Sequence, residues 1–463
     1  MTPDIVIIGG GFAGLTAANR LAQHGLSPLV LEAGREKYYM CNSRICTGSL
    51  HVSYHSPTEP PDDLYQYIMD GSGGTARADL ARVLADQAAT TIEWMKSEGA
   101  AFQKHAVRDD GTQMLAPLRE MRPGLDWENS GPNLFLQKLE ASLLRRGGEI
   151  RRGCRAQQIL RDGDRITGVE ISTDTGGEII AAETVIIADG GFQAASDLVA
   201  HHISGTEGKL QQRNAGTGLG DGLQMASDIG AALVGLETFY GHVLSRDAMD
   251  NDRLWPYPQL DLISTQGIVV DGTGRRFADE GLGGIHMANA IARLDDPLSA
   301  FAIFDEAVWE DARHADQVPP NPSVPDEGGT VLTADSIDAL AKQAGLDSVA
   351  VKDTVASFNR CAQNKSGATL TPTRSTDRYE PWAIETAPFH AIPLCAGITA
   401  TSGGLAVNGK GQVMDEADNP IPGLYAAGSA VGGIEGGPRS GYVGGLIKAF
   451  GIGLIAADTI SGP

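Results

Sequence analysis

The glycine-rich turn at residues 9–14 (GGGFAG) constrains the fold of this chain more than any other feature. It follows an apolar strand predicted over residues 4–8 and opens a helix predicted from Phe12 to about His24. A second apolar strand is predicted over residues 28–32 and ends at Glu32. A lone GxGxxG also occurs in turns that bind no nucleotide, but strand, turn, helix, strand and acid in this order favour a dinucleotide-binding βαβ unit.

Each residue of this unit has a predicted physical role. Gly9 permits the tight turn, Gly11 lets the backbone approach a pyrophosphate, and Gly14 lets the helix pack on the sheet. The free N–H groups at the start of the helix face the phosphates. Glu32 is predicted to accept hydrogen bonds from the adenosine ribose.

Further strands predict a parallel sheet with a second domain inserted into the first. Short apolar runs that end in glycines recur at residues 184–191 and 423–428. Between them, residues 226–390 change to helical and mixed segments, including an amphipathic stretch at residues 333–361 in which Asp335 is a candidate N-cap and Gly345 a break. The predicted division is therefore 1–225, 226–390 and 391–463, with residues 318–329 as a surface loop.

Composition narrows the class of protein. The formal net charge of -22 argues against nucleic acid or an anionic membrane as a partner. No apolar run approaches the roughly 20 residues of a membrane-spanning helix, and the N-terminus enters a strand directly, so we expect a cytoplasmic protein. Five scattered cysteines without a CxxC pair predict neither a disulfide framework nor a metal or iron–sulfur site.

Seven segments, spread over almost the whole chain and in this order, resemble the succinate dehydrogenase/fumarate reductase flavoprotein family. The family includes L-aspartate oxidase, and the chain looks nearest to its tricarballylate dehydrogenase and 3-ketosteroid Δ1-dehydrogenase branches. The resemblance implies an α/β fold in which a Rossmann-like FAD-binding domain with a parallel central sheet (residues 1–225 and 391–463) is split around an α+β capping domain (residues 226–390). The segments are EAG at 32–34, NSR at 42–44, TVIIADGGF at 184–192, GLGDGLQMA at 218–226, GIVVDGTGRRFADE at 267–280, GGLAVN at 403–408 and GLYAAGS at 423–429.

The resemblance also implies the FAD contacts. A helix that begins in the segment GGLI at 444–447 would direct its N-terminal dipole at the flavin N1 and C2 carbonyl. Ser429 stands where fumarate reductases often carry an acid. No histidine occupies the position of covalent attachment in succinate dehydrogenases, because His51 lies beyond it, so we expect non-covalent FAD. The predicted contacts are Gly9, Gly11, Phe12, Ala13, Gly14, Glu32, Ala33, Asn42, Ser43, Thr47, Gly48, Ala156, Asp189, Gly190, Gly222, Gly428, Ser429, Gly444, Gly445, Leu446 and Ile447.

The family's typical reaction removes or adds two hydrogens across a carbon–carbon bond beside a carboxylate or ketone. Fumarate reductases carry an arginine proton donor shortly after an RFxxE segment, but here residues 276–286 read RFADEGLGGIH. Their paired histidines are replaced by Thr399 and Ala400. The sequence therefore argues against fumarate itself and favours desaturation, with a small carboxylate or ketone as the substrate and an unidentified electron acceptor or donor.

Candidate catalytic residues follow from side-chain chemistry and from the same resemblance. Arg439, aligned with a one-residue gap, would bind a substrate carboxylate or carbonyl, or else form a structural salt bridge. His242 matches the family's cap-entrance histidine and could instead be a pocket wall. Tyr442 could be an acid, a base or an oxyanion donor, or could only pack. Further substrate contacts are predicted at Arg44, Tyr240 and His286, and more weakly at Arg122.

Three alternatives stay open at this point. An enoate- or fumarate-type reductase would run the same chemistry in the opposite direction. An oxidase would consume oxygen, as L-aspartate oxidase does. A non-catalytic flavin-binding or electron-transfer protein would bind FAD but show no flavin redox change with any carboxylate or ketone.

Overall fold

The computed structural model describes residues 3–104, 112–119, 127–314 and 323–462. Its first sheet has six strands in the order β19-β20-β10-β1-β2-β6. All neighbours pair in parallel except β19 and β20, which are antiparallel. The strands are β1 (Ile5–Ile8), β2 (Pro28–Glu32), β6 (Glu149–Arg152), β10 (Val185–Ile187), β19 (Gln412–Met414) and β20 (Pro420–Ala426).

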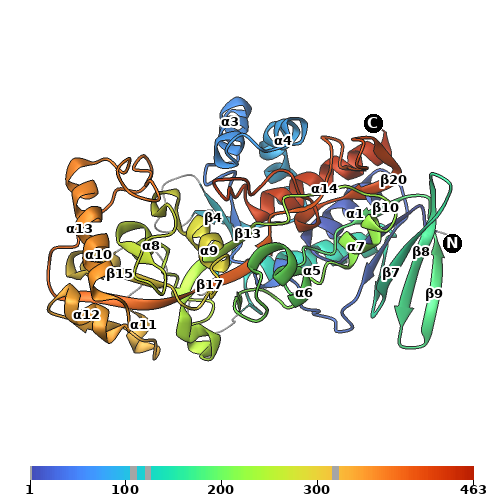
Figure 1. Cartoon of the computed structure of the whole chain (residues 1–463). Helices are drawn as coiled ribbons and strands as arrows, with labels where there is room; N and C mark the ends of the chain where they lie inside the picture. The colour runs from blue at the N-terminus through green and yellow to red at the C-terminus, as the bar shows by residue number, and fades with distance from the viewer. Residues whose placement is uncertain (1–2, 105–111, 120–126, 315–322, 463) are drawn as a thin grey trace.

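Long helices cover this sheet. Helix α1 (Phe12–Gln23) packs against α14 (Gly445–Ser461) and α5 (Gly131–Arg145), while α14 also contacts α4 (Ala78–Ser97), which pairs with α3 (Pro61–Gly71). The rings of Phe12 and Phe450 lie 4.8 Å apart between α1 and α14. Figure 1 shows the first and last helices of the chain side by side, so the two ends of the sequence build one core.

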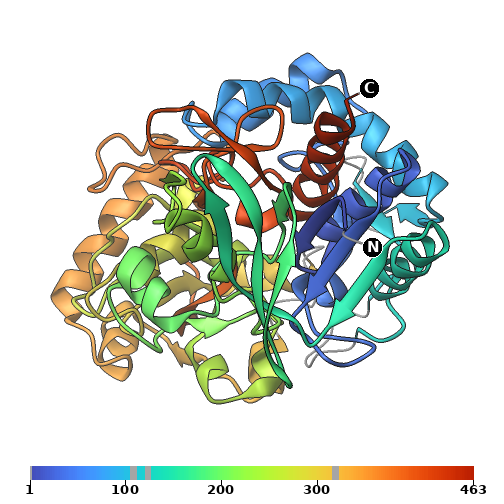
Figure 2. The same cartoon turned by 90° about the vertical axis from the view of Figure 1, so that its right-hand side faces the viewer.

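Two small antiparallel sheets flank this body. One is the meander β7 (Arg155–Asp162), β8 (Arg165–Thr173) and β9 (Gly176–Ala181), which Figure 2 brings to the front. The other joins β3 (Ser49–Leu50), β5 (Gln113–Leu115) and β4 (Phe102–Lys104). Short elements complete the region, namely α2 (Asn42–Ile45), α6 (Ser196–Val199), α7 (Asp221–Ser227), β12 (Leu233–Val234) and β18 (Gly404–Leu405).

A second six-stranded sheet is organised around the long strand β17 (Phe389–Thr401). Antiparallel neighbours of β17 are β13 (Phe239–Ser245), β15 (Phe301–Asp305) and β16 (Leu332–Ala334); β11 (Gln211–Gln212) is parallel to it, and β14 (Ile268–Val270) pairs with β15. The helices around it are α8 (Asp261–Gln266), α9 (Gly284–Ala292), α10 (Glu306–His314), α11 (Ser323–Asp326), α12 (Ile337–Gln343) and α13 (Ser348–Asn364). In Figure 1, β17 runs from this second body into the first.

The fold class predicted from the sequence is confirmed in its main elements. The predicted strand at residues 28–32 and helix from Phe12 match β2 and α1. The segment at residues 301–309 is a strand followed by a helix. The core around the second sheet also takes in Phe192, Val199 and Leu210, which precede the predicted boundary at residue 225.

Two local predictions differ from the structure. Helix α12 is capped by Ser336 and not by Asp335: Ser336 takes an extended conformation, and its Oγ accepts the Ala339 N–H at 3.3 Å. The stretch at residues 318–329 contains helix α11; its first five residues lie outside the described part of the chain. Gly345 does break the helix, with a φ of +72°.

Candidate active site

A cavity of about 1060 Å³ lies where the carboxyl ends of β1, β2 and β10 meet β13, β17 and the start of α14. Ligand sites of open α/β sheets occupy this end of the strands. The lining includes the glycine turn after β1 and, further along, aromatic side chains from both bodies.

The glycine turn builds the first end of the cavity. Gly9 has a φ of +106°, and a Cβ at Gly14 would lie 2.0 Å from the Gly9 carbonyl oxygen, so neither position accepts a side chain. Helix α1 begins after Gly11 without a side-chain cap. Ser43 Oγ accepts the Phe12 N–H at 2.9 Å from α2. Gly11, Phe12 and Ala13 line the cavity, so the start of this helix suits a phosphate.

Glu32 lies beside this turn. Its carboxylate accepts the N–H groups of Gly10 at 2.9 Å and Gly34 at 2.6 Å. Burial raises the pKa of Glu32, and these two hydrogen bonds oppose the rise. The ribose contact predicted for Glu32 stays a prediction, and the carboxylate already fixes the backbone that surrounds the site.

Asp189 lies deep in the cavity wall after β10. Its Oδ2 accepts the Gly222 N–H at 2.7 Å, whereas its Oδ1 is buried and has no hydrogen-bond partner among the described residues. Burial raises the pKa of this carboxyl to about 7. An unpaired polar atom beside the glycine turn fits a site that a polar ligand completes.

A second helix start faces the other half of the cavity. Helix α14 begins at Gly445, after Gly444 with a φ of +123°, and has no side-chain cap except the Tyr442 hydroxyl, which accepts the Gly445 N–H at 2.7 Å. A Cβ at Gly444 would lie 2.4 Å from the His51 carbonyl oxygen. Because the starts of two helices line one cavity, the residues present fit a dinucleotide whose pyrophosphate would lie at α1 and whose flavin would lie at α14.

Most residues predicted to contact the cofactor line this cavity. Four of the predicted residues lie behind the lining and support the wall of the cavity. Gly14 packs under the turn, and the Gly222 N–H donates to Asp189. Gly444 shapes the entry to α14, and Ile447 is fully buried in the core. The residues in the lining are Gly9, Gly11, Phe12, Ala13, Glu32, Ala33, Asn42, Ser43, Thr47, Gly48, Ala156, Asp189, Gly190, Gly428, Ser429, Gly445 and Leu446.

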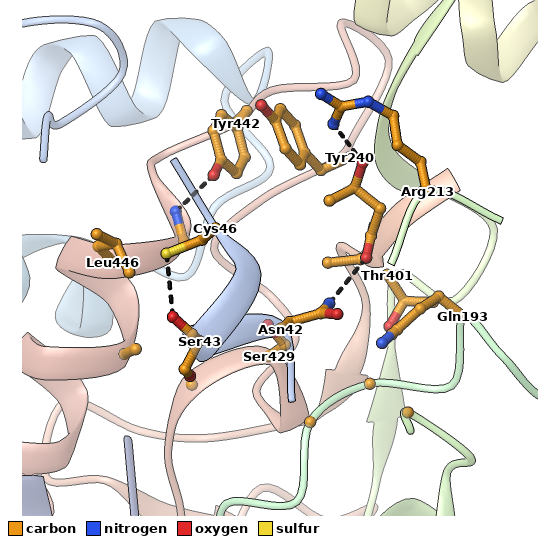
Figure 3. Close-up of a pocket in the computed structure, with 18 of the residues that line it drawn as sticks. Asn42, Ser43, Cys46, Gln193, Arg213, Tyr240, Thr401, Ser429, Tyr442 and Leu446 are labelled. Carbon is orange, nitrogen blue, oxygen red and sulfur yellow. Dashed lines mark hydrogen bonds between the residues drawn. The ribbon is translucent and has the colours of Figure 1, made fainter. Parts of the chain in front are cut away.

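At the α14 end the structure brings together three predicted catalytic or substrate residues. The rings of Tyr240 and Tyr442 are stacked, with centroids 3.7 Å apart and planes 11° apart. His242 Nε2 lies 3.1 Å from the Tyr240 hydroxyl, and His242 Nδ1 lies 2.6 Å from Asp261 Oδ2. Figure 3 shows Tyr240 and Tyr442 with their rings side by side and Arg213 next to Tyr240.

Arginines also line this end of the cavity, and the sequence predicted one of them. Arg439 is exposed and lines the cavity as predicted. Arg213 was missed: its guanidinium donates to the Thr399 hydroxyl at 3.0 Å and to the Pro256 carbonyl at 3.1 Å. The sequence offered one signal for Arg213, its place five residues before the glycine segment at 218–226, but no sequence pattern links Arg213 to Thr399.

Other aromatic groups of the lining were also missed. Tyr54 adjoins Tyr442 with ring centroids 6.2 Å apart, and the Arg378 guanidinium lies 5.3 Å from the centre of the Tyr54 ring. Burial raises the pKa values of both Tyr54 and Tyr442, so both phenols stay neutral at physiological pH. This end of the cavity is therefore aromatic, with neutral hydroxyls and nearby cations.

Two predicted substrate residues, Arg44 and His286, do not line the cavity. Arg44 is fully buried and does not line it, because its guanidinium donates to the Tyr39 carbonyl and to Asn133 Oδ1 and lies 3.5 Å from Glu140 Oε1. His286, on α9, is also absent from the lining, and burial lowers the pKa of its imidazole. Arg122 lies outside the described residues.

Three of the five cysteines, Cys154, Cys361 and Cys395, are buried, and the other two are partly buried. Cys41 and Cys46 flank α2 beside the cavity, and burial raises their pKa values to about 12 and about 11. In the described ranges of the chain, no group of three or more His, Cys, Asp or Glu side chains could hold a metal ion. No helix in those ranges is long and apolar enough to cross a membrane.

Comparisons with known proteins agree with this geometry. The chain is 25% identical over 459 residues to a fumarate reductase (cytochrome) of Shewanella frigidimarina, covering 95% of this chain and 74% of that protein. It is 24% identical to the 4-oxocyclohexanecarboxylate 2-dehydrogenase of Sinomonas cyclohexanicum, covering 100% of this chain and 93% of that protein. The 3-ketosteroid-Δ4-(5α)-dehydrogenase of Rhodococcus jostii RHA1 shares the fold, with a TM-score of 0.75 and 19% identity over 100% of this chain and 97% of that one.

The family model described as FAD binding domain matches residues 4–442. That match confirms FAD as the cofactor, the relatives confirm the predicted resemblance to fumarate reductases, and the ketosteroid dehydrogenase shares the fold. The chain therefore belongs to the FAD binding domain family and is an FAD-dependent oxidoreductase acting on CH–CH groups.

Proposed function

We propose that the chain desaturates a cyclic or open-chain ketone, removing two hydrogens from the carbon pair beside the carbonyl group. The observation that carries this proposal is the convergence of the Tyr442 hydroxyl and the Gly445 N–H at the start of α14, 2.7 Å apart. A neutral hydroxyl that accepts this N–H and keeps its own proton suits a carbonyl oxygen that gains negative charge during the reaction.

The phenol of Tyr442 is suited to this role for two reasons. Its oxygen accepts the Gly445 N–H, so its own proton is directed to another acceptor. Burial raises its pKa, which keeps the proton in place. A carbonyl oxygen that approaches Tyr442 would therefore receive a hydrogen bond, and the developing enolate would be stabilised without a metal ligand.

Bound FAD supplies a two-electron acceptor for hydride at N5. Gly11 and Ser43 would hold the pyrophosphate region, and Gly445 and Leu446 the flavin region. We further propose that the FAD is non-covalent and that residues 226–390 act as the capping domain. The aromatic walls contributed by Tyr240 and Tyr54 exclude water from the carbon–carbon bond.

Two observations favour desaturation over reduction. The segment at 281–284, which lines the cavity, carries glycines and a leucine where fumarate reductases have an arginine donor. Arg276 lies in the preceding part of that motif. It forms a buried ion pair with Glu280, which directs its guanidinium away from the role of proton donor. An anionic substituent on the substrate would meet Arg439, which is exposed at the cavity edge.

A reductase remains the second candidate because several relatives, including the vinyl phenol reductase of Lactiplantibacillus plantarum, are named for that direction. Anaerobic mixing of the FAD-loaded protein with cyclic ketones, 3-ketosteroids and di- and tricarboxylates, followed at about 450 nm, separates the two. Bleaching by a saturated ketone supports desaturation. Reoxidation of pre-reduced flavin by enones, with no bleaching by any saturated compound, would show reduction instead.

A further inference from the structure

We propose that Tyr240, His242 and Asp261 form a proton relay, in which Tyr240 is the base that removes the proton beside the carbonyl group and Asp261 positions His242 behind it. The proposal rests on the proposed function and adds to it the path of the proton. Tyr240 and His242 lie on β13, two residues apart, and Asp261 is the first residue of α8. All three line the cavity.

The hydrogen-bond geometry gives the relay a direction. Asp261 Oδ2 lies 2.6 Å from His242 Nδ1, so a carboxylate there accepts the Nδ1–H and leaves Nε2 as an acceptor. The Tyr240 hydroxyl lies 3.1 Å from Nε2 and donates to it. The imidazole is thus held in the tautomer that can take the phenolic proton.

Asp261 is itself held in place from two sides. Its second oxygen, Oδ1, accepts the Val243 N–H at 2.9 Å, which ties the carboxylate to the strand that carries the histidine. A Cβ at Gly284 would lie 2.1 Å from the Asp261 Cγ, so the absence of a side chain at Gly284 leaves the space that the carboxylate occupies. The Asp261 carboxylate is therefore positioned by a backbone hydrogen bond and by the space at Gly284, and its side chain is only partly exposed.

The stacked pair Tyr240 and Tyr442 divides the two tasks of the reaction. Tyr442 faces the carbonyl oxygen beside Gly445, while Tyr240, 3.7 Å away between ring centroids, has the histidine behind it. The two phenols therefore reach neighbouring atoms of one bound ketone. Tyr442 keeps its proton and Tyr240 can pass its proton on.

The step balances in atoms and charge. The C–H bond beside the carbonyl breaks and its proton joins the Tyr240 oxygen, while the Tyr240 O–H proton moves to His242 Nε2. The resulting imidazolium is stabilised by the Asp261 carboxylate. The hydride from the neighbouring carbon goes to oxidised FAD, and its departure with the proton leaves the carbon–carbon double bond. His242 releases its proton to solvent before the next turnover.

The test compares wild type with Asp261→Asn and His242→Gln, all loaded with FAD. Asp311→Asn is the matched control, because the Asp311 carboxylate also accepts a side-chain N–H, from Gln266 Nε2 at 2.7 Å, and Asp311 does not line the cavity. FAD content and thermal unfolding confirm that each variant is folded. The rate of flavin bleaching by a ketone that reduces the wild type is then measured from pH 5 to pH 10.

The relay predicts that the wild-type rate rises with pH as His242 becomes able to accept a proton. In Asp261→Asn the maximal rate falls by roughly 10²- to 10⁴-fold and the rise moves to lower pH, because the carboxylate no longer stabilises the imidazolium. In His242→Gln this rise is lost. Other charged or titrating groups near the relay are Tyr54, Arg213, Arg378, Tyr379, Glu435 and Tyr442, none of which these substitutions change.

A second readout needs neither substrate nor turnover. In protein labelled with ¹⁵N at histidine, the resonances that disappear in His242→Gln should show Nδ1 protonated and Nε2 bare, and this pattern should be lost in Asp261→Asn. A protonated Nε2 in the wild type, or an unshifted pH profile in Asp261→Asn, would overturn the relay. If no ketone bleaches the wild-type flavin, the proposed function fails, and the tautomer still decides the relay geometry.

Discussion

At the scale of single residues, the site depends on groups whose proton or charge is fixed by burial. Tyr442 is a neutral phenol that caps the first N–H of α14, and Asp189 is a buried carboxyl with one unpaired oxygen. Arg44 differs from both, because its buried guanidinium forms its hydrogen bonds with structural residues and not with groups of the cavity. Residue type alone does not separate these roles, because burial and partners come from other elements.

The Tyr442→Phe variant should reduce flavin with a ketone roughly 10²- to 10³-fold more slowly, since it loses one oxyanion donor. Anaerobic stopped-flow absorbance measures the rate, and the FAD content should be unchanged. Tyr425→Phe is the matched control, because Tyr425 lies in β20 outside the cavity. Equal rates in the two variants would remove Tyr442 from the carbonyl site.

Asp189 should make stability fall as pH rises. Burial raises its pKa from 3.8 to about 7, so the folded FAD-free protein keeps a proton that the unfolded chain releases. This contribution is complete below about pH 4 and is lost as pH rises through about 7. In urea unfolding, the stability of wild type relative to Asp189→Asn should therefore fall by roughly 1.4 kcal/mol per pH unit in that window. A constant difference would contradict the raised pKa.

At the scale of elements, capping decides where helices begin. Helix α12 starts after Ser336, whose side chain accepts the Ala339 N–H, although Asp335 is an equally good capping residue type. Ser336 takes the extended N-cap conformation, and strand β16, which pairs with β17, ends at Ala334 just before the two residues. A one-residue difference of this kind follows from the position of the preceding strand.

Ser336→Ala should lower the free energy of unfolding by about 1 kcal/mol, because the Ala339 N–H loses its side-chain acceptor. Asp335→Ala, the matched control one residue earlier, should change stability by less than about 0.5 kcal/mol. Urea unfolding of both variants measures the difference. A larger loss of stability in Asp335→Ala than in Ser336→Ala would show that Asp335 is the cap.

At the scale of the whole molecule, the cavity exists only because two bodies meet. Strand β17 runs from the second sheet to the first, and Asn42 ties the two together, with Nδ2 donating to the Thr399 carbonyl at 2.9 Å and Oδ1 accepting the Ala215 N–H at 2.8 Å. Arg213 donates to the side chain of the same Thr399. Thr399 thus connects both sides of the cavity.

Asn42→Ala should lose about 1–3 kcal/mol of stability, because it leaves two backbone groups without their side-chain partner. It should also bind FAD more weakly, since Asn42 lines the cavity. Thermal unfolding with and without added FAD measures both effects, because a ligand that binds only the folded state raises Tm. An unchanged FAD affinity would show that the link serves stability alone.

The sequence by itself determined the dinucleotide turn, its strands and helix, and the type of cofactor. These depend on contiguous residues: the glycines at 9, 11 and 14 and the acid at 32 act through local backbone geometry, and the long-range motif order identified the FAD family. The stacking of Tyr240 on Tyr442 and the placing of Arg213 beside Thr399 were decided by tertiary structure alone, as was the enclosure of Arg44. The residues of each pair lie far apart in sequence, and only the packing of two sheets and a helix start around one cavity brings them within contact distance.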